Sequence, residues 1–195
     1  MSELISQVDS GREFILGEYL ESLEKYIQAV CSRTENDALT YDILDTEKSK
    51  TNKLLALKEK QRQMKVGDIW QEVLGSYDGF INLKVGHETG LDILSHTKKI
   101  VIEIKNRTNT DNASSKKTNF DKLAKFKKNN PEYLCIYANI NADTEQKTLH
   151  GSIKKILHNG VEIEHQIGYG FLKFILGDNT DVIIQFVKTA IDKYT

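Results

Sequence analysis

Residues 90–107 read GLDILSHTKKIVIEIKNR, and this stretch decides which fold the chain can adopt. It contains two apolar runs separated by the polar residues 95–98, a pattern that predicts a β-hairpin. Three charged residues interrupt the apolar runs: Asp92, Glu103 and Lys105. Charged side chains are uncommon inside strands unless they have a role there. These three residues are therefore the first candidates for a functional site.

The spacing of the charged residues predicts that they gather on one face of the hairpin. Side chains alternate between the two faces of a strand, so Glu103 and Lys105 share a face that the neighbouring isoleucines leave. Pairing of the two strands can bring Asp92 beside Glu103 on that face. Two carboxylates this close repel each other unless a proton or a cation compensates. Oxygen ligands without a nearby His or Cys cluster favour Mg²⁺, with Mn²⁺ as a substitute, over zinc.

This arrangement suits the hydrolysis of a phosphodiester. A metal held by carboxylates offsets charge on the phosphate and lowers the pKa of a bound water. Lys105 would orient or help deprotonate that water, or neutralise charge on the phosphate. Glu72, on a helix predicted over residues 69–74, is a candidate further metal ligand, and Glu88 is its rival. An E-x-K tripeptide alone also fits an exposed ion pair, but the position of Asp92 favours the catalytic interpretation.

The rest of the pattern places this hairpin in an α/β fold. Gly67 is expected to interrupt a helical pattern, so that Asp68 caps a new helix, and the Asn159-Gly160 pair predicts a hairpin turn. Alternating helices and strands predict one domain, residues 1–195, with a central mixed sheet flanked by helices. Helices are predicted over 11–31, 53–65, 69–74, 118–129, 169–177 and 181–194, and further strands over 80–85, 133–138, 148–154 and 160–165.

The motif residues resemble the PD-(D/E)xK nuclease superfamily, in which an acidic residue on one strand precedes an E-x-K on the next. Glu103-Ile104-Lys105 matches the tripeptide, whereas Gly90-Leu91-Asp92 lacks the proline that often precedes the aspartate. The matching core covers about residues 68–138.

A closer resemblance is to type II restriction endonucleases, through the runs 103–137 and 67–75, and within them to the group that cuts GGNCC-like sites. It implies a PD-(D/E)xK restriction-endonuclease-like core and Mg²⁺-dependent cleavage of double-stranded DNA at a short palindromic site. Asp92, Glu103 and Glu72 would hold the metal, and Lys105 would join them in catalysis.

The resemblance also implies an organisation for the whole chain. Residues 1–66 would form a mainly helical N-terminal part, residues 67–138 the catalytic core, and residues 139–195 a C-terminal hairpin and helices. A homodimer is implied, because a two-fold symmetric protein matches a two-fold symmetric site. The helices at 11–31 and 53–65 are candidates for the dimer contact, with packing inside one subunit as the alternative. A cognate DNA methyltransferase is implied in the cell, although not as a bound partner.

The segment after the E-x-K is expected to contact DNA. Residues 98–128 carry a net charge of +7, whereas residues 1–47 carry −8 and the whole chain −1. Side chains of Asn, Ser and Thr bond phosphates or base edges, and Arg and Lys add charge. A flexible polar loop is the alternative. The candidate DNA-contacting residues are Arg107, Asn109, Asn112, Ser114, Ser115, Lys116, Lys117 and Asn119.

Composition and the N-terminal sequence indicate the cellular compartment. No apolar run reaches the roughly 18 residues that a membrane span needs, and the N-terminus lacks the layout of a signal peptide. The two cysteines, Cys31 and Cys135, show no metal or redox spacing, so a reduced, cytoplasmic protein is expected. Two other functions stay open: a structure-specific repair or junction-resolving nuclease of the same fold, and a non-catalytic DNA-binding module whose three charges form an ion network.

Overall fold

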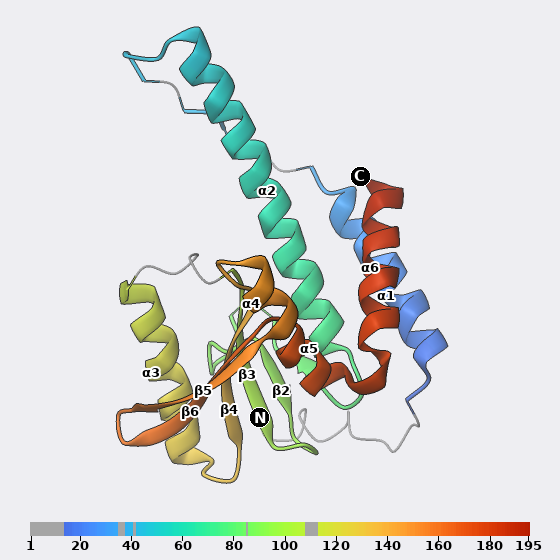
Figure 1. The fold of residues 1–195 in the computed structure, drawn as a ribbon, viewed down its shortest axis with the longest axis vertical. Helices are drawn as coiled ribbons and strands as arrows, with labels where there is room; N and C mark the ends of the chain where they lie inside the picture. The colour runs from blue at the N-terminus through green and yellow to red at the C-terminus, as the bar shows by residue number, and fades with distance from the viewer. Residues whose placement is uncertain (1–13, 35–37, 41, 85, 108–112) are drawn as a thin grey trace.

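The computed structural model describes residues 14–34, 38–40, 42–84, 86–107 and 113–195 (Figure 1). Within these ranges, helices surround one β-sheet. The helices are α1 (Leu16–Cys31), α2 (Glu47–Gly75), α3 (Ala113–Asn129), α4 (Glu145–His150), α5 (Gly168–Leu176) and α6 (Thr180–Tyr194), with a 3₁₀ turn at Gly177–Asn179. The strands are β1 (Ile81–Asn82), β2 (Ile93–Ser95), β3 (Ile100–Arg107), β4 (Leu134–Asn141), β5 (Ser152–His158) and β6 (Val161–Ile167).

The described strands form a mixed sheet in the order β1-β2-β3-β4-β6-β5. β2 and β3 pair antiparallel, with Ile93 opposite Ile102, which confirms the predicted hairpin. β3, β4 and β6 run parallel, and β5 returns antiparallel to β6 at the far edge. Parallel neighbours need a crossover connection, and α3 supplies it between β3 and β4. The predicted fold class, a mixed sheet flanked by helices, is confirmed.

The two faces of the sheet have different covers. Ile102 and Ile104 of β3 pack into a core with residues of α1, α2, α5 and α6. Val101, on the other face of the same strand, packs with Leu123 of α3 and Tyr137 of β4. Figure 1 shows α3 standing apart from the other helices across the sheet. The alternation of β3 therefore sends the side chains of Glu103 and Lys105 to the face that α3 covers.

Helix α2 is continuous for 29 residues, so the predicted interruption at Gly67 is wrong. A helical glycine costs only about 1 kcal/mol relative to alanine, and two features offset that cost. The Thr46 side chain caps the helix by accepting from the Ser49 N–H, and Ile69 and Val73 are buried at the other end. The half before Gly67 extends beyond the body of the molecule (Figure 1).

The C-terminal part corrects one predicted strand. The predicted strand 148–154 is wrong in its first half, because α4 occupies those positions and β5 begins only at Ser152. Thr144 starts α4 by accepting a hydrogen bond from the Lys147 N–H. The sequence prediction followed the alternating pattern of 148–154 and gave this capping residue no weight. The predicted turn is confirmed, since Asn159 and Gly160 both have positive φ between β5 and β6.

Candidate active site

The hairpin brings Asp92, Glu103 and Lys105 together on the α3 face of the sheet. Glu103 is only 3% exposed, and the Lys105 Nζ donates to its Oε1 at 2.7 Å. Asp92 lies just before β2, and its backbone N–H donates to the Ile102 carbonyl at 3.2 Å. The negative charge of Asp92 raises the pKa of Glu103, so the two carboxylates are near enough to interact.

The Asp92 carboxylate is held from two sides. Its Oδ2 accepts the Ile104 backbone N–H at 2.8 Å, so this side chain continues the pairing with β3 beyond the start of β2. Its Oδ1 accepts from the Gln71 Nε2 at 3.2 Å. Gln71 comes from α2, which approaches the sheet here, and sequence reasoning missed it in favour of its neighbour Glu72. No feature of the sequence distinguishes these neighbours, because only the rotation of α2 decides which side chain reaches Asp92.

The electrostatics of the pair favour a bound cation. Burial raises the pKa of Asp92, against the Ile104 hydrogen bond and the charges of Lys105 and Lys122. Burial, and then the charge of Asp92, raise the pKa of Glu103, against the same two lysines. Lys122 belongs to α3, and its Nζ donates to the Gly90 carbonyl at 3.0 Å. Two buried carboxylates that resist joint ionisation will ionise more readily beside a divalent ion.

One oxygen of the cluster has no protein partner among the described residues. Glu103 Oε2 is buried and accepts no hydrogen bond there, which is costly unless something else satisfies it. Together with the neighbouring Asp92 it offers the hard oxygen donors that Mg²⁺ prefers. In the described part of the chain no group of three or more acidic, His or Cys side chains is placed to hold a metal. Mg²⁺ commonly binds through one or two carboxylates plus waters and substrate phosphate, so the donors fit that ion.

Glu72, the predicted further metal ligand, has hydrogen-bond partners outside the acidic cluster, and its role as a ligand stays a prediction. Glu72 Oε2 accepts from the Asn82 Nδ2 at 3.1 Å and the Lys84 Nζ at 3.0 Å. The carboxylate is therefore engaged with β1 and the loop after it. The rival Glu88 lies in the same loop region, and it lines a neighbouring pocket instead.

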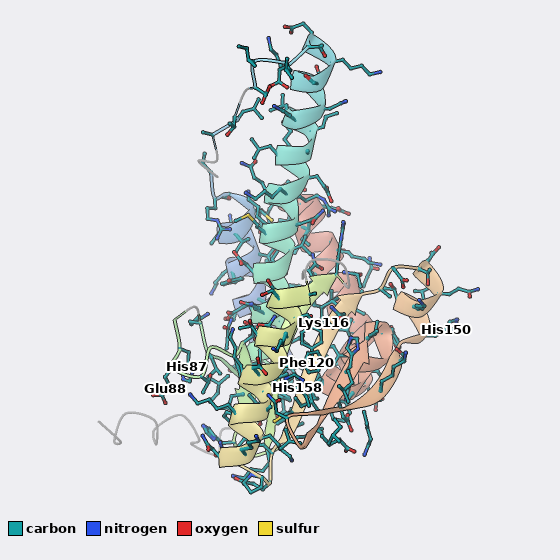
Figure 2. All side chains as sticks on the ribbon, turned by 90° about the vertical axis from the view of Figure 1, so that its left-hand side faces the viewer. His87, Glu88, Lys116, Phe120, His150 and His158 are labelled. Carbon is teal, nitrogen blue, oxygen red and sulfur yellow. The ribbon has the colours of Figure 1, made fainter. Side chains whose placement is uncertain are left out.

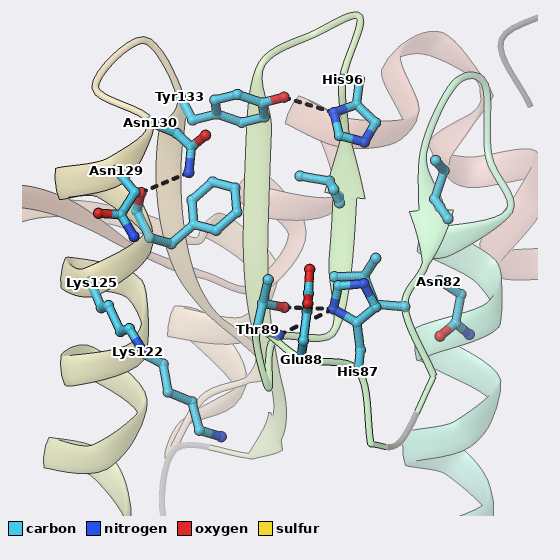
Figure 3. Close-up of a pocket in the computed structure, with 14 residues that line it drawn as sticks. Asn82, His87, Glu88, Thr89, His96, Lys122, Lys125, Asn129, Asn130 and Tyr133 are labelled. Carbon is cyan, nitrogen blue, oxygen red and sulfur yellow. Dashed lines mark hydrogen bonds between the residues drawn. The ribbon is translucent and has the colours of Figure 1, made fainter. Parts of the chain in front are cut away.

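This pocket has a volume of about 600 Å³ and lies between α3 and the strands β1 and β2. Figure 3 shows Lys122 and Lys125 on the α3 side, with Glu88 and His87 in the loop opposite. At its far end the His96 Nδ1 lies 2.8 Å from the Tyr133 hydroxyl. Because Lys122 lines the pocket and also acts on both carboxylates, the pocket adjoins the acidic cluster.

The predicted DNA-contacting residues differ in their exposure in the structure. Asn109 and Asn112 lie outside the described residues. Asn119 is only 6% exposed, with its Oδ1 at 3.5 Å from the Lys122 Nζ, so it does not face a ligand in solution as predicted. Lys116 lies 5.9 Å from the centre of the Tyr137 ring, and Figure 2 shows it along α3 before Phe120. The exposed candidates at the start of α3 are Ser114, Ser115, Lys116 and Lys117.

Arg107 ends β3 and is held by a buried polar network. Its carbonyl accepts from the Asn139 Nδ2 at 3.2 Å, and Asn139 Oδ1 lies 2.7 Å from the His165 Nε2. Burial, assisted by the charges of Lys116 and Lys154, lowers the pKa of His165 to about 4. The neutral imidazole therefore donates from Nε2 to Asn139. Sequence reasoning missed both partners, because an Asn and a His in strands carry no signal of which carbonyl they reach.

Comparisons with known proteins point to one enzyme family. The model of the Eco47II restriction endonuclease family matches residues 34–189. The type II restriction enzyme Sau96I of Staphylococcus aureus is 27% identical over 143 residues, which cover 69% of this chain and 53% of that enzyme. The chain thus spans about half the length of this curated relative. No solved structure is significantly similar to the chain.

Among the described helices, none combines the length and the apolar character that crossing a bilayer requires.

Proposed function

This chain belongs to the Eco47II restriction endonuclease family, and we propose that it is a Mg²⁺-dependent type II restriction endonuclease. Its substrate would be double-stranded DNA with a short palindromic site, of the GGNCC kind that the sequence resemblance suggests. The observation that carries the proposal is the buried Glu103 carboxylate, bonded to Lys105 through one oxygen and lacking a partner at the other among the described residues. Such a carboxylate, beside Asp92, suits a metal that binds phosphate.

In this mechanism Asp92 and Glu103 would hold the metal, and Mn²⁺ could replace Mg²⁺. When bound, the ion supplies charge stabilisation to the phosphate and lowers the pKa of a water. The Ile104 N–H and Gln71 fix the orientation of Asp92, so the ligand is positioned before the ion arrives. Lys105 is 24% exposed at its side chain, which leaves its ammonium accessible to a phosphate that enters the site. There it would neutralise developing negative charge or orient the attacking water.

The proposal extends to assembly and cellular setting. One acidic cluster per chain hydrolyses one strand, so a double-strand break at a palindrome needs two copies related by a two-fold axis. We infer a homodimer for this reason. A cognate methyltransferase would protect the cell's own DNA at the same site.

The test is digestion of unmethylated phage-length DNA with Mg²⁺, with EDTA as the metal-free control. Discrete fragments that require metal, and that end at one short palindrome by end sequencing, are the expected result. A metal-dependent smear would replace this proposal by a structure-specific nuclease of the same fold. Binding without cleavage under Mg²⁺ and Mn²⁺ would indicate a DNA-binding module with an internal ion network.

A further inference from the structure

A second cluster of charged groups lies where the projecting half of α2 meets the end of β3. Its centre is Glu59, one of whose oxygens accepts from the Arg62 Nε at 2.8 Å. The other accepts from the Arg62 Nη2 at 2.9 Å and the Gln63 Nε2 at 2.8 Å. From β3, the Arg107 Nη2 reaches the same oxygen at 3.3 Å. Three side chains from two elements thus converge on one carboxylate.

This convergence has the form of an anion-binding site. A guanidinium that donates two parallel hydrogen bonds matches phosphate as well as carboxylate. The hydrogen bonds of Arg62 and Gln63 lower the pKa of Glu59 to about 2, so the carboxylate is charged at neutral pH. The side chains of Glu59, Arg62 and Arg107 are 44%, 59% and 45% exposed, so a ligand can approach them from solvent.

The cluster borders a cleft, and the helix segment that carries it is basic. A cleft of about 480 Å³ opens between α2, the ends of β3 and β4, and α4, with Arg62 and Arg107 in its wall. Its floor includes Asn106 and Asn141, which are joined by a hydrogen bond from the Asn141 Nδ2 to the Asn106 Oδ1 at 2.9 Å. From α2 the lining includes Arg62 and Val66, and its two acidic residues are Asp143, which pairs with Lys147 at 2.9 Å, and Glu145. Residues 48–66, the part of α2 that carries the cluster, have a net charge of +6. A polyanion is the ligand that this charge favours.

The cleft adjoins the candidate active site along β3. Arg107 follows Lys105 by two residues on the same strand face, a separation of about 7 Å at the usual rise of a strand. Successive phosphates of one DNA strand advance by about 3.4 Å along the helix axis. A phosphate at Arg107 would therefore lie within about two nucleotides of a phosphate at Lys105.

We propose that Arg62, Gln63 and Arg107 form a binding site for a DNA backbone phosphate next to the scissile one, and that Glu59 occupies it until DNA displaces the carboxylate. This inference rests on the proposed nuclease function for the identity of the polyanion. Exposed ion pairs contribute little to stability, so the exchange of carboxylate for phosphate meets little resistance. Glu59 then acts as a competitor that weakens binding at this position.

The experiment measures the affinity of the full-length chain for a short duplex over a range of salt concentrations, in a Lys105→Ala background with EDTA present so that the duplex stays intact. Glu59→Gln should tighten binding about twofold to fivefold, the range that an exposed ion pair spans. Arg62→Ala should weaken it and reduce the slope of log affinity against log salt by about one. Arg62→Lys, which keeps the charge without the two-pronged geometry, should keep the slope and lose part of the affinity.

The matched control is Glu47→Gln at the far end of the same helix. Glu47 pairs with Lys50 at 2.7 Å, and its substitution removes the same charge. Among the described residues its side chain bonds within α2 and not to a second element. Equal tightening by Glu47→Gln and Glu59→Gln would reduce the effect to net charge and overturn the proposal. An unchanged salt slope in Arg62→Ala would overturn it as well. These readouts are binding constants, so they are independent of the digestion test. If the protein cut no DNA in that test, the nuclease function would be refuted, and the phosphate site could still be measured.

Discussion

Two glutamates of this protein make ion pairs of nearly equal length in opposite environments. Glu103 meets Lys105 at 2.7 Å and is 3% exposed, whereas Glu59 meets Arg62 at 2.8 Å and is 44% exposed. Burial raises the pKa of Glu103, and hydrogen bonds lower the pKa of Glu59. The ionised carboxylate is therefore disfavoured at Glu103 and favoured at Glu59. The two pairs have nearly the same length, so the distance between the charges does not explain the difference. Their exposure to solvent does.

The buried pair of Glu103 and Lys105 is not explained by a contribution to the stability of the fold. A buried ion pair seldom stabilises a fold more than apolar residues of the same size. Glu103 also leaves one oxygen without a partner among the described residues and repels Asp92. This cost is understandable if a cation and a phosphate complete the site. The exposed pair carries no such cost and can exchange its partner, and four measurements test this contrast.

The largest effect is expected from Lys105→Ala, which breaks the buried pair. Cleavage should fall by about 10²- to 10⁴-fold, since the group beside the phosphate is lost. DNA binding should persist, because the other basic residues remain. Lys98→Ala is the control: Lys98 also pairs with a carboxylate, Asp78 at 3.1 Å, but in the hairpin turn. Cleavage rates under single-turnover conditions check the prediction, and full activity of Lys105→Ala would refute the catalytic assignment.

Gln71→Ala tests whether the support of Asp92 from α2 matters to the metal. Loss of the 3.2 Å hydrogen bond to Oδ1 should weaken metal affinity by about 10- to 100-fold, as for other residues that orient a ligand. The readout is the Mg²⁺ concentration for half-maximal cleavage, and excess Mg²⁺ should restore the rate. Gln61→Ala, about 15 Å further along the same helix, is the control. A reduced rate that no amount of Mg²⁺ restores would contradict a role in holding the ligand.

Asp92→Asn should stabilise the metal-free protein while it removes cleavage. The pKa of Asp92 is raised in the folded state, so its stabilising protonated form is present at low pH and is lost as pH rises through the folded pKa. At neutral pH the neutral amide should therefore raise the melting temperature, because it carries no charge to desolvate. The gain should shrink toward acid pH, where the wild-type carboxyl is itself neutral. Melting in EDTA across pH checks this, and a gain that grows toward acid pH would contradict it.

The contrast between the two pairs also marks what could be predicted from the sequence. The hairpin and the shared face of Glu103 and Lys105 followed from strand alternation, which depends on neighbours along the chain. The choice between Gln71 and Glu72 did not, because it depends on the rotation of α2 against the sheet. The Glu59–Arg107 contact joins residues 48 positions apart, and no local pattern encodes it.

Two errors, one in a helix boundary and one in the exposure of a side chain, have the same origin. Gly67 is a correct local signal for a weak helix, but packing of Ile69 and Val73 and the cap at Thr46 outweigh it. Asn119 belongs to a polar run that suggests exposure, yet the rotation of α3 turns it inward. In both cases packing against the rest of the fold, which no local pattern encodes, decided the outcome.

The smallest effect is expected from Glu59→Gln on stability. Its partners are exposed, so water replaces the lost bonds, and the melting temperature should stay within about 1 °C of the wild type. Glu103→Gln, which changes the same atoms at a buried position, is the comparison and should shift it by more, upward in EDTA. The pair of melting curves thus measures burial with the chemistry held constant. If Glu59→Gln lowered the melting temperature as much as a core substitution does, the cluster would be a structural clamp between α2 and β3, and DNA would not displace its carboxylate.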